Sequence, residues 1–138
     1  YIMHDTCVLT YGNCIYFDPG TSRHLECPSK ESMINHRFPE EIEEGKKYRK
    51  YFFVPLHLRT WRADAFKQIA KKAFLRPNGD WMRFCEDQAI FYQLLELANS
   101  QYQIIPTPLY SYNTSHNFND IKINDKEMLF DELLIRRK

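Results

Sequence analysis

The stretch Gly79–Ala98, GDWMRFCEDQAIFYQLLELA, carries the strongest structural signal in the chain. Phe91 and Leu95 widen an apolar helical face that is formed by residues at i, i+4, i+7 and i+8, namely Ile90, Leu94, Leu97 and Ala98. Such a wide apolar face predicts a helix at the centre of the fold. Glu86 and Asp87 stand at the start of this helix, so the same element carries the apolar face and a pair of acids that could take part in a reaction.

Short strand-like segments precede and follow the central helix. Cys7–Phe17 is rich in β-branched and aromatic residues around a Gly-Asn pair, which predicts two strands around a turn or one bulged strand. Tyr51–Leu58 contains a proline and predicts a strand end or an irregular buried segment. Tyr102–Pro106 predicts a short strand, which Leu109–Tyr112 continues.

Three other segments have helical signals. Pro39–Glu44 begins with proline and continues with acids, as first helical turns prefer. Thr60 is a suitable N-cap for a helix over Trp61–Phe74. Asp125–Arg137 has acids early, cations late and apolar residues at helical spacing: Met128, Leu129, Leu133 and Leu134. Thr21–Pro39 has little periodicity and predicts a long surface loop. Interleaved helices and short strands predict the α/β class, with a short mixed sheet and packed helices.

Length and charge limit the functions that the chain can have. The 138 residues suit a single domain or a fragment of a larger one, and the first residues, YIMHDTCVLTYG, already have the pattern of structured chain, which indicates a fragment. The net charge of +1 is too small to attract the phosphate backbone of a nucleic acid. No apolar run approaches the ~20 residues of a membrane span. Aromatic residues make up 15% of the chain, which suits either sugar stacking or core filling.

The cysteines argue against a zinc finger and a disulfide scaffold. The four of them have no Cys-x-x-Cys pair and no regular spacing: Cys7, Cys14, Cys27 and Cys85. Their low number in a chain of this length predicts a reducing, cytoplasmic compartment, with the membrane periphery as an alternative for a longer protein.

Glu86 and Asp87 allow two interpretations. Acids in a first helical turn favour the positive end of the helix dipole, which is a purely structural role. A carboxylate in a cleft also accepts a proton from an attacking hydroxyl, and the helix dipole keeps Asp87 ionised for this role of general base.

A second polar cluster, His57, Arg59 and Thr60, follows Pro55. In an extended segment His57 and Arg59 point to the same side. Arginine offers a rigid donor fork for phosphate or carboxylate, although an ordinary ion pair explains the residue equally well. Cys85 is a buried thiol or a nucleophile paired with a histidine. His116 lies in an Asn-rich segment and is a solvated side chain or a metal ligand.

Three segments together resemble the second half of a family 2 glycosyltransferase with the GT-A fold: PLHLRTWRADAFKQI, GDWMRFCEDQAIFYQLLELA and YQIIPTPLYSYNTSHN. The resemblance covers about Cys7 to Asn117 and depends on the order and spacing of the motifs. It implies a GT-A-like C-terminal portion that forms the acceptor side of a nucleotide-sugar-dependent, inverting enzyme. The partners that it implies are a nucleotide-sugar donor and a carbohydrate or other hydroxyl acceptor.

The resemblance also implies roles for individual residues. Asp87 matches the catalytic base and Glu86 supports it, whereas Trp81 stacks on an acceptor sugar. The donor-sugar pocket is implied at His57, Arg59 and Thr60. His116 falls near a segment that provides a further metal ligand in some GT-A enzymes.

The chain departs from the family pattern in two ways. It lacks the D-x-D motif that holds Mn²⁺ or Mg²⁺ against the nucleotide, and it lacks the nucleotide-binding half that precedes this motif. A divalent metal is therefore expected only in the full-length enzyme, and this chain alone is expected not to transfer sugar. Two alternatives stay open: a non-catalytic module that binds glycans or proteins, and a hydrolase built on Cys85 and His57.

Overall fold

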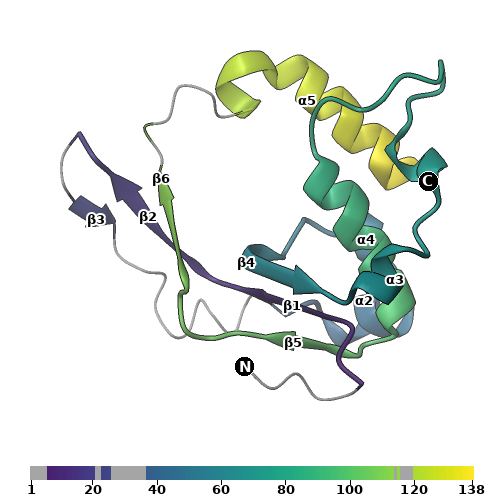
Figure 1. Cartoon of the computed structure of the whole chain (residues 1–138), viewed down its shortest axis with the longest axis horizontal. Coiled ribbons are helices and arrows are strands. Elements are labelled where there is room, and N and C mark those ends of the chain that lie inside the picture. The colour runs from purple at the N-terminus through teal and green to yellow at the C-terminus, as the bar shows by residue number, and fades with distance from the viewer. Residues whose placement is uncertain (1–5, 21–22, 26–36, 114, 116–119) are drawn as a thin grey trace.

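The computed structural model describes residues 6–20, 23–25, 37–113, 115 and 120–138. Its backbone is organised around two chain segments that run side by side. β1 (Leu9–Gly12) leads directly into β2 (Cys14–Asp18), and β5 (Tyr102–Ile104) is followed by β6 (Tyr110–Asn113). β1 pairs with β5 and β2 with β6, both in parallel, so the segments form a long ribbon (Figure 1).

Each half of the ribbon gains an antiparallel edge strand. β4 (Leu56–Trp61) pairs with β1, with an irregularity in register between Thr10 and Gly12, and β3 (Arg23–Leu25) pairs with β2. The described strands therefore form two sheets, in the orders β4-β1-β5 and β3-β2-β6. Helices and a mixed sheet confirm the predicted α/β class.

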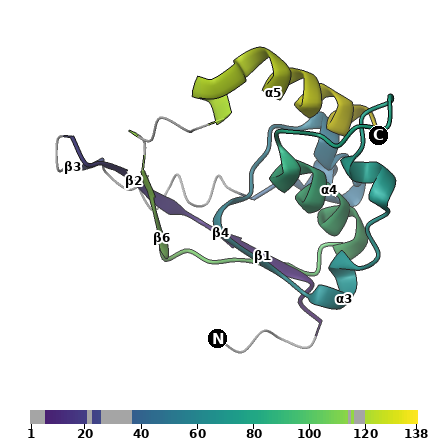
Figure 2. The same ribbon diagram turned by 45° about the horizontal axis from the view of Figure 1, so that its top comes forward.

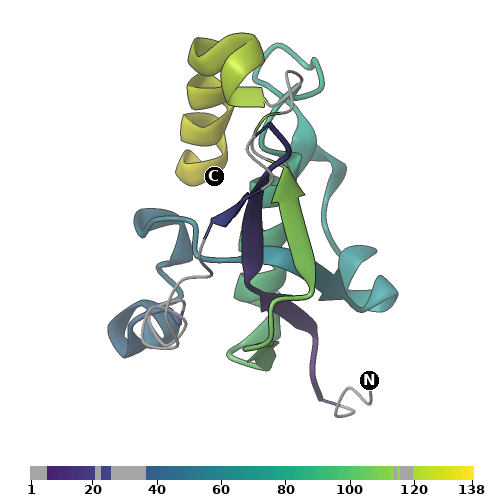
Figure 3. The same ribbon diagram turned by 90° about the vertical axis from the view of Figure 1, so that its left-hand side faces the viewer.

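The helices gather on the half of the ribbon that contains β4, β1 and β5. α4 (Glu86–Ala98) and α3 (Ala63–Phe66) lie beside this sheet, and α5 (Asp120–Arg137) lies beyond α4 (Figures 1 and 2). The remaining helical turns are short: α2 (Glu40–Glu44), η1 (Tyr48–Lys50) and η2 (Lys71–Phe74). Seen from the side, the ribbon stands upright with α5 at one end (Figure 3). Among the described residues, no helix is long and apolar enough to cross a membrane.

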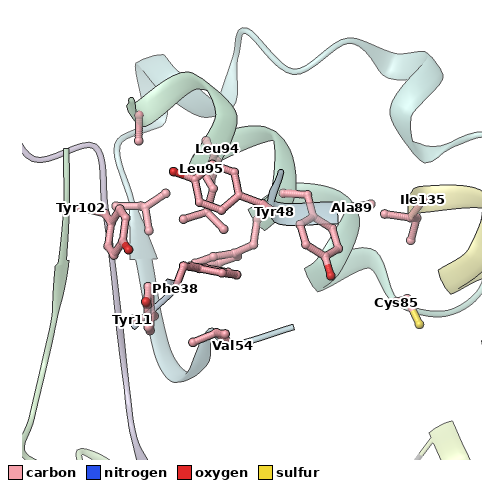
Figure 4. Packing of buried hydrophobic residues seen from close by; sticks show 14 of the residues in the cluster. Tyr11, Phe38, Tyr48, Val54, Cys85, Ala89, Leu94, Leu95, Tyr102 and Ile135 are labelled. Carbon is pink, nitrogen blue, oxygen red and sulfur yellow. The ribbon is translucent and has the colours of Figure 1, made fainter. Parts of the chain in front are cut away.

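α4 is the centre of the hydrophobic core, as its sequence predicts. Its inward face is fully buried and consists of Ala89, Phe91, Tyr92, Leu94, Leu95 and Ala98. Figure 4 shows Leu94 and Leu95 on the helix side of this core, Tyr11 and Tyr102 on the strand side, and other aromatic rings between them. Leu97 was placed on the apolar face by its spacing, but it is exposed, and Ile90 is only partly buried.

Several predicted elements are confirmed. Two strands lie on either side of Asn13, but Gly12 ends the first of them and the predicted turn is absent, because the chain runs straight on from β1 into β2. The helix over Glu40–Glu44 ends at Gly45. The C-terminal helix is continuous from Asp125 onward, because Asn124 interrupts the helical backbone before it. Most of the predicted loop over 21–39 lies outside the described residues, and β3 occupies part of it.

The predicted helix over Trp61–Phe74 is wrong. Thr60 is no N-cap: it pairs with Thr10 across the sheet, and the two hydroxyl oxygens lie 2.6 Å apart. Trp61 pairs with Leu9 in the same ladder, so the strand continues through the position where the helix was expected to begin. Only Ala63–Phe66 is α-helical, and η2 is a separate 3₁₀ turn.

α5 is fixed to the rest of the fold by a buried acid. Asp131 is fully buried and accepts hydrogen bonds from Nε and Nη2 of Arg76, each at 2.7 Å. It also accepts the backbone amides of Arg83 and Phe84, at 3.0 and 3.3 Å. The loop that leads into α4 is therefore held by α5.

Candidate active site

The candidate site is built around an ion pair between β4 and the start of α4. Nη1 of Arg59 donates to Oδ2 of Asp87 at 2.6 Å. The other oxygen of Asp87, Oδ1, accepts the backbone amide of Gln88 at 2.7 Å. The Asp87 side chain is 42% exposed, whereas that of Arg59 is only 11% exposed. A nearly buried cation therefore presents a carboxylate to solvent.

Arg59 is held in place on several sides. Its Nε donates to the carbonyl oxygen of Pro55 at 3.0 Å. Its guanidinium carbon lies 5.1 Å from the ring centre of Phe53 and 5.6 Å from that of Phe91. Cation–π contacts of this kind favour a fixed guanidinium plane. The two phenylalanines carry no chemical signal in the sequence, so their contribution was not predictable from it.

The start of α4 determines where its two acids point. Cys85 precedes the helix in the left-handed region, with φ of 60°, which residues with a Cβ rarely adopt. Asp87 meets Arg59, whereas Glu86 is exposed at the surface. The acid pair predicted from the sequence is thus divided: one member belongs to the ion pair and the other faces solvent.

His57 connects the ion pair to an aromatic cluster, defined here as His57, Tyr110 and Tyr112. The His57 ring stacks on Tyr110, with ring centres 4.8 Å apart and an interplanar angle of 25°, and lies 5.9 Å from the ring of Tyr112. Burial lowers the pKa of His57, and the charge of Arg59 lowers it further against the opposing effect of Asp87. The histidine is therefore neutral at pH 7 and behaves as an aromatic surface.

The two tyrosines of the aromatic cluster were missed as site residues. They lie two positions apart in the strand-like run LYSYN, and a strand places such residues on one face. This alternation was a usable signal, but the partner ring on β4 was not, because pairing between distant strands leaves no mark in the local sequence.

The remaining predicted site residues do not join the ion pair. The hydroxyl of Thr60 bonds to Thr10 in the sheet. Trp81 is exposed and forms a bridge with Leu75, and the Nζ of Lys71 lies 5.3 Å from its ring centre. None of the contacts described for Trp81 links it to Asp87. His116 lies outside the described residues.

Cys85 has the surroundings of a structural thiol. It is buried, and its Sγ donates to the carbonyl oxygen of Met128 at 3.6 Å. Burial, followed by the charge of Asp87, raises the pKa of this thiol to about 12. Reactive cysteines instead have depressed pKa values in electropositive surroundings, so the arrangement does not favour a Cys85–His57 hydrolase.

The described residues do not form a site for the divalent metal that the family resemblance implies. Nowhere among them do three His, Cys, Asp or Glu side chains come together in a way that could hold an ion. The chemistry proposed for Asp87 therefore involves no metal ion held by the described residues.

A hollow of about 630 Å³ lies elsewhere, between η2, the following turn and the C-terminal half of α4. Lys72, Arg76, Gln93 and Glu96 are among the residues that line it, whereas Arg59 and Asp87 are not. Its charged groups are largely occupied: Arg49 pairs with Glu96, and Arg76 pairs with acids of α5. This hollow is distinct from the acceptor cleft expected beside Asp87.

Comparison of the chain with protein-family models, with curated proteins and with solved structures found no match in any of the three. The glycosyltransferase resemblance accordingly depends on the motifs alone. Function has to be argued from the chemistry of the site.

Proposed function

We propose that the chain is the acceptor side of a glycosyltransferase that moves a sugar from a nucleotide-sugar donor to an acceptor hydroxyl with inversion. The observation that carries the proposal is the Arg59–Asp87 pair, in which a nearly buried arginine fixes a half-exposed carboxylate at the start of α4. A general base must be fixed in position and open to its substrate, and Asp87 meets both requirements.

In the proposed reaction Asp87 accepts the proton of the acceptor hydroxyl as its oxygen attacks the anomeric carbon. The bond from that carbon to the diphosphate oxygen breaks, and the nucleoside diphosphate leaves with the bonding electrons. An alcohol is far too weak an acid for a carboxylate to deprotonate in advance, so proton transfer accompanies the attack rather than preceding it. The hydrogen bonds from Arg59 and from the amide of Gln88 hold the carboxylate in one orientation before the reaction.

Arg59 has a different role from the one that the sequence suggested. Its Nη1 is bonded to Asp87 and its Nε to Pro55, so its described contacts orient the base. We therefore assign Arg59 as a positioning residue rather than a ligand of the donor phosphates. Glu86 is exposed and makes no described contact with Asp87, which leaves it a secondary role at most.

One observation favours a second candidate, a glycan-binding module without catalysis. The aromatic cluster presents Tyr110, which is exposed, next to a neutral His57. Flat aromatic faces bind the C–H groups of sugar rings whether or not a reaction follows. The enzyme proposal predicts sugar transfer and sugar binding, whereas this alternative predicts binding alone.

The test follows transfer of labelled sugar from a panel of nucleotide sugars by the full-length protein, with and without Asp87→Asn. The expected result is a loss of at least about 100-fold in kcat for the variant, because general-base catalysis contributes on this scale. Asp64→Asn is the matched control, since Asp64 also pairs with an arginine, Arg62 at 2.7 Å, on an exposed surface. Near-normal transfer by Asp87→Asn would rule out the base assignment.

Arg59→Lys distinguishes a positioning role from a direct one. It retains the positive charge but loses the fixed planar fork. We expect a reduced kcat with an unchanged KM for the donor. A raised donor KM with unchanged kcat would instead indicate a phosphate contact.

A further inference from the structure

The outward face of α5 carries an apolar stripe with a cation at each end, defined here as Lys126, Leu129, Phe130, Leu133 and Arg137. The three apolar side chains are 54%, 51% and 45% exposed in chain order. Lys126, Phe130, Leu133 and Arg137 follow one another at intervals of four, three and four, which places them on one side of the helix. α5 lies at an outer edge of the molecule (Figures 1 and 2). The Phe130 ring lies 5.9 Å from the guanidinium carbon of Arg76 but keeps half of its surface exposed.

The acids of α5 are directed away from the stripe. Glu127 and Asp131 pair with Arg76, at 2.8 and 2.7 Å, and Glu132 pairs with Arg136 at 2.8 Å. From residue 122 of α5 onward, where the side chains are described, Asp125 is the exception: it is exposed at the start of the regular helix, where its Oδ1 accepts the amide of Lys126. Ion pairs with Arg76, and with Arg136 within α5, thus neutralise Glu127, Asp131 and Glu132 and leave Lys126 and Arg137 as cations at the two ends of an apolar surface.

This separation of charge argues against a second copy of the chain as the occupant. In an antiparallel pairing of two such helices, Lys126 of one copy lies near Arg137 of the other. In a parallel pairing, each cation lies near its own counterpart. Both arrangements bring like charges together at the ends of a contact that consists of only three apolar side chains per copy.

We propose that the stripe binds an anionic lipid surface. A convex helix with Leu and Phe along one line and Lys and Arg at its ends suits insertion at the headgroup level, where long cationic side chains reach the phosphates. From Lys126 to Arg137 the stripe is about 16 Å long, at the rise of an α-helix. The inward ion pairs of Arg76 keep the helix oriented with this face outward. The inference does not depend on the proposed glycosyl transfer.

The test measures sedimentation of the chain with vesicles of phosphatidylcholine alone and of phosphatidylcholine with about one third phosphatidylglycerol. Binding to the anionic vesicles, weakened by salt, is expected. A double variant that combines Lys126→Gln and Arg137→Gln should lower the partition coefficient on the order of 30-fold, since each cation near an anionic surface contributes about fivefold. A triple variant that combines Leu129→Ser, Phe130→Ser and Leu133→Ser, called the serine variant, should bind the anionic vesicles no better than the unchanged chain binds neutral ones.

Leu97→Ser is the matched control, because Leu97 is exposed to the same degree as Leu133 but lies on α4. It should bind vesicles like the unchanged chain, and circular dichroism should show all variants folded. Absence of vesicle binding by the unchanged chain would overturn the proposal. So would equal binding by the serine variant, or a stripe-dependent change in oligomeric state, which would indicate self-association.

Discussion

Asp131 is the single residue on which the position of the α4 start depends most directly. Burial alone would raise the pKa of its carboxyl, but hydrogen bonds from Arg76 and from the amides of Arg83 and Phe84 outweigh burial and hold the pKa below its usual value. The carboxylate form is thus part of the folded structure. Through it, a helix near the C-terminal end of the chain fixes the loop that presents Asp87.

We predict that Asp131→Asn lowers the free energy of unfolding by about 3 kcal/mol at neutral pH, because it leaves the largely buried Arg76 with one acid fewer. The folded pKa lies below the unfolded one, so the contribution is present above the unfolded carboxyl pKa and is lost as pH falls through the folded pKa. Urea denaturation over a pH series measures both effects. Asp125→Asn, an exposed acid on the same helix, should change stability by less than about 0.5 kcal/mol. Equal losses in both variants would contradict the prediction.

The chemistry of single residues was easier to predict than their partners. Asp87 and Arg59 were both singled out by residue type, and the structure brings them together across 28 positions of sequence. That Asp87 and not Glu86 pairs with Arg59 was not predictable, since the start of α4 depends on the left-handed Cys85 and on the loop that Asp131 holds.

At the scale of elements, α4 was predictable because its apolar spacing is a local property of the chain. Which edge of α4 is exposed to solvent was not predictable in the same way. Leu97 continues the helical repeat but is 45% exposed, whereas Leu94 has no exposure at all. The helix expected after Thr60 failed for the opposite reason: Thr60 and Trp61 pair with residues of β1 about 50 positions earlier, and this pairing overrides a local capping signal.

Leu94 and Leu97 provide a matched pair for measuring how much of the core depends on α4. Leu94→Ala should lower the free energy of unfolding by about 2–5 kcal/mol, since it removes a fully buried side chain and leaves a cavity. Leu97→Ala should cost less than about 1 kcal/mol, because this side chain is half in solvent already. Both values come from urea unfolding followed by circular dichroism. Similar losses would mean that the helix buries a different face.

At the scale of the whole molecule, the chain is a bent ribbon with helices on one half only. The parallel pairs β1 with β5 and β2 with β6 join segments separated by about 90 residues, and no local pattern encodes such pairing. Asn13 lies where the ribbon passes from one sheet to the other. It is fully buried, and neither polar atom of its side chain has a hydrogen-bond partner within the described part of the chain.

This position predicts an unusual response to substitution. A buried amide without a partner costs about 1–3 kcal/mol, so Asn13→Ala, which removes the amide at the expense of a small cavity, should leave the free energy of unfolding unchanged or raise it by about 1 kcal/mol. Asn13→Asp has the same shape but places a charge there. Its folded pKa should be raised, so that it is destabilised at neutral pH and recovers as pH falls. A loss of more than about 1 kcal/mol in Asn13→Ala would show that the amide is bonded and that it helps to join the two sheets.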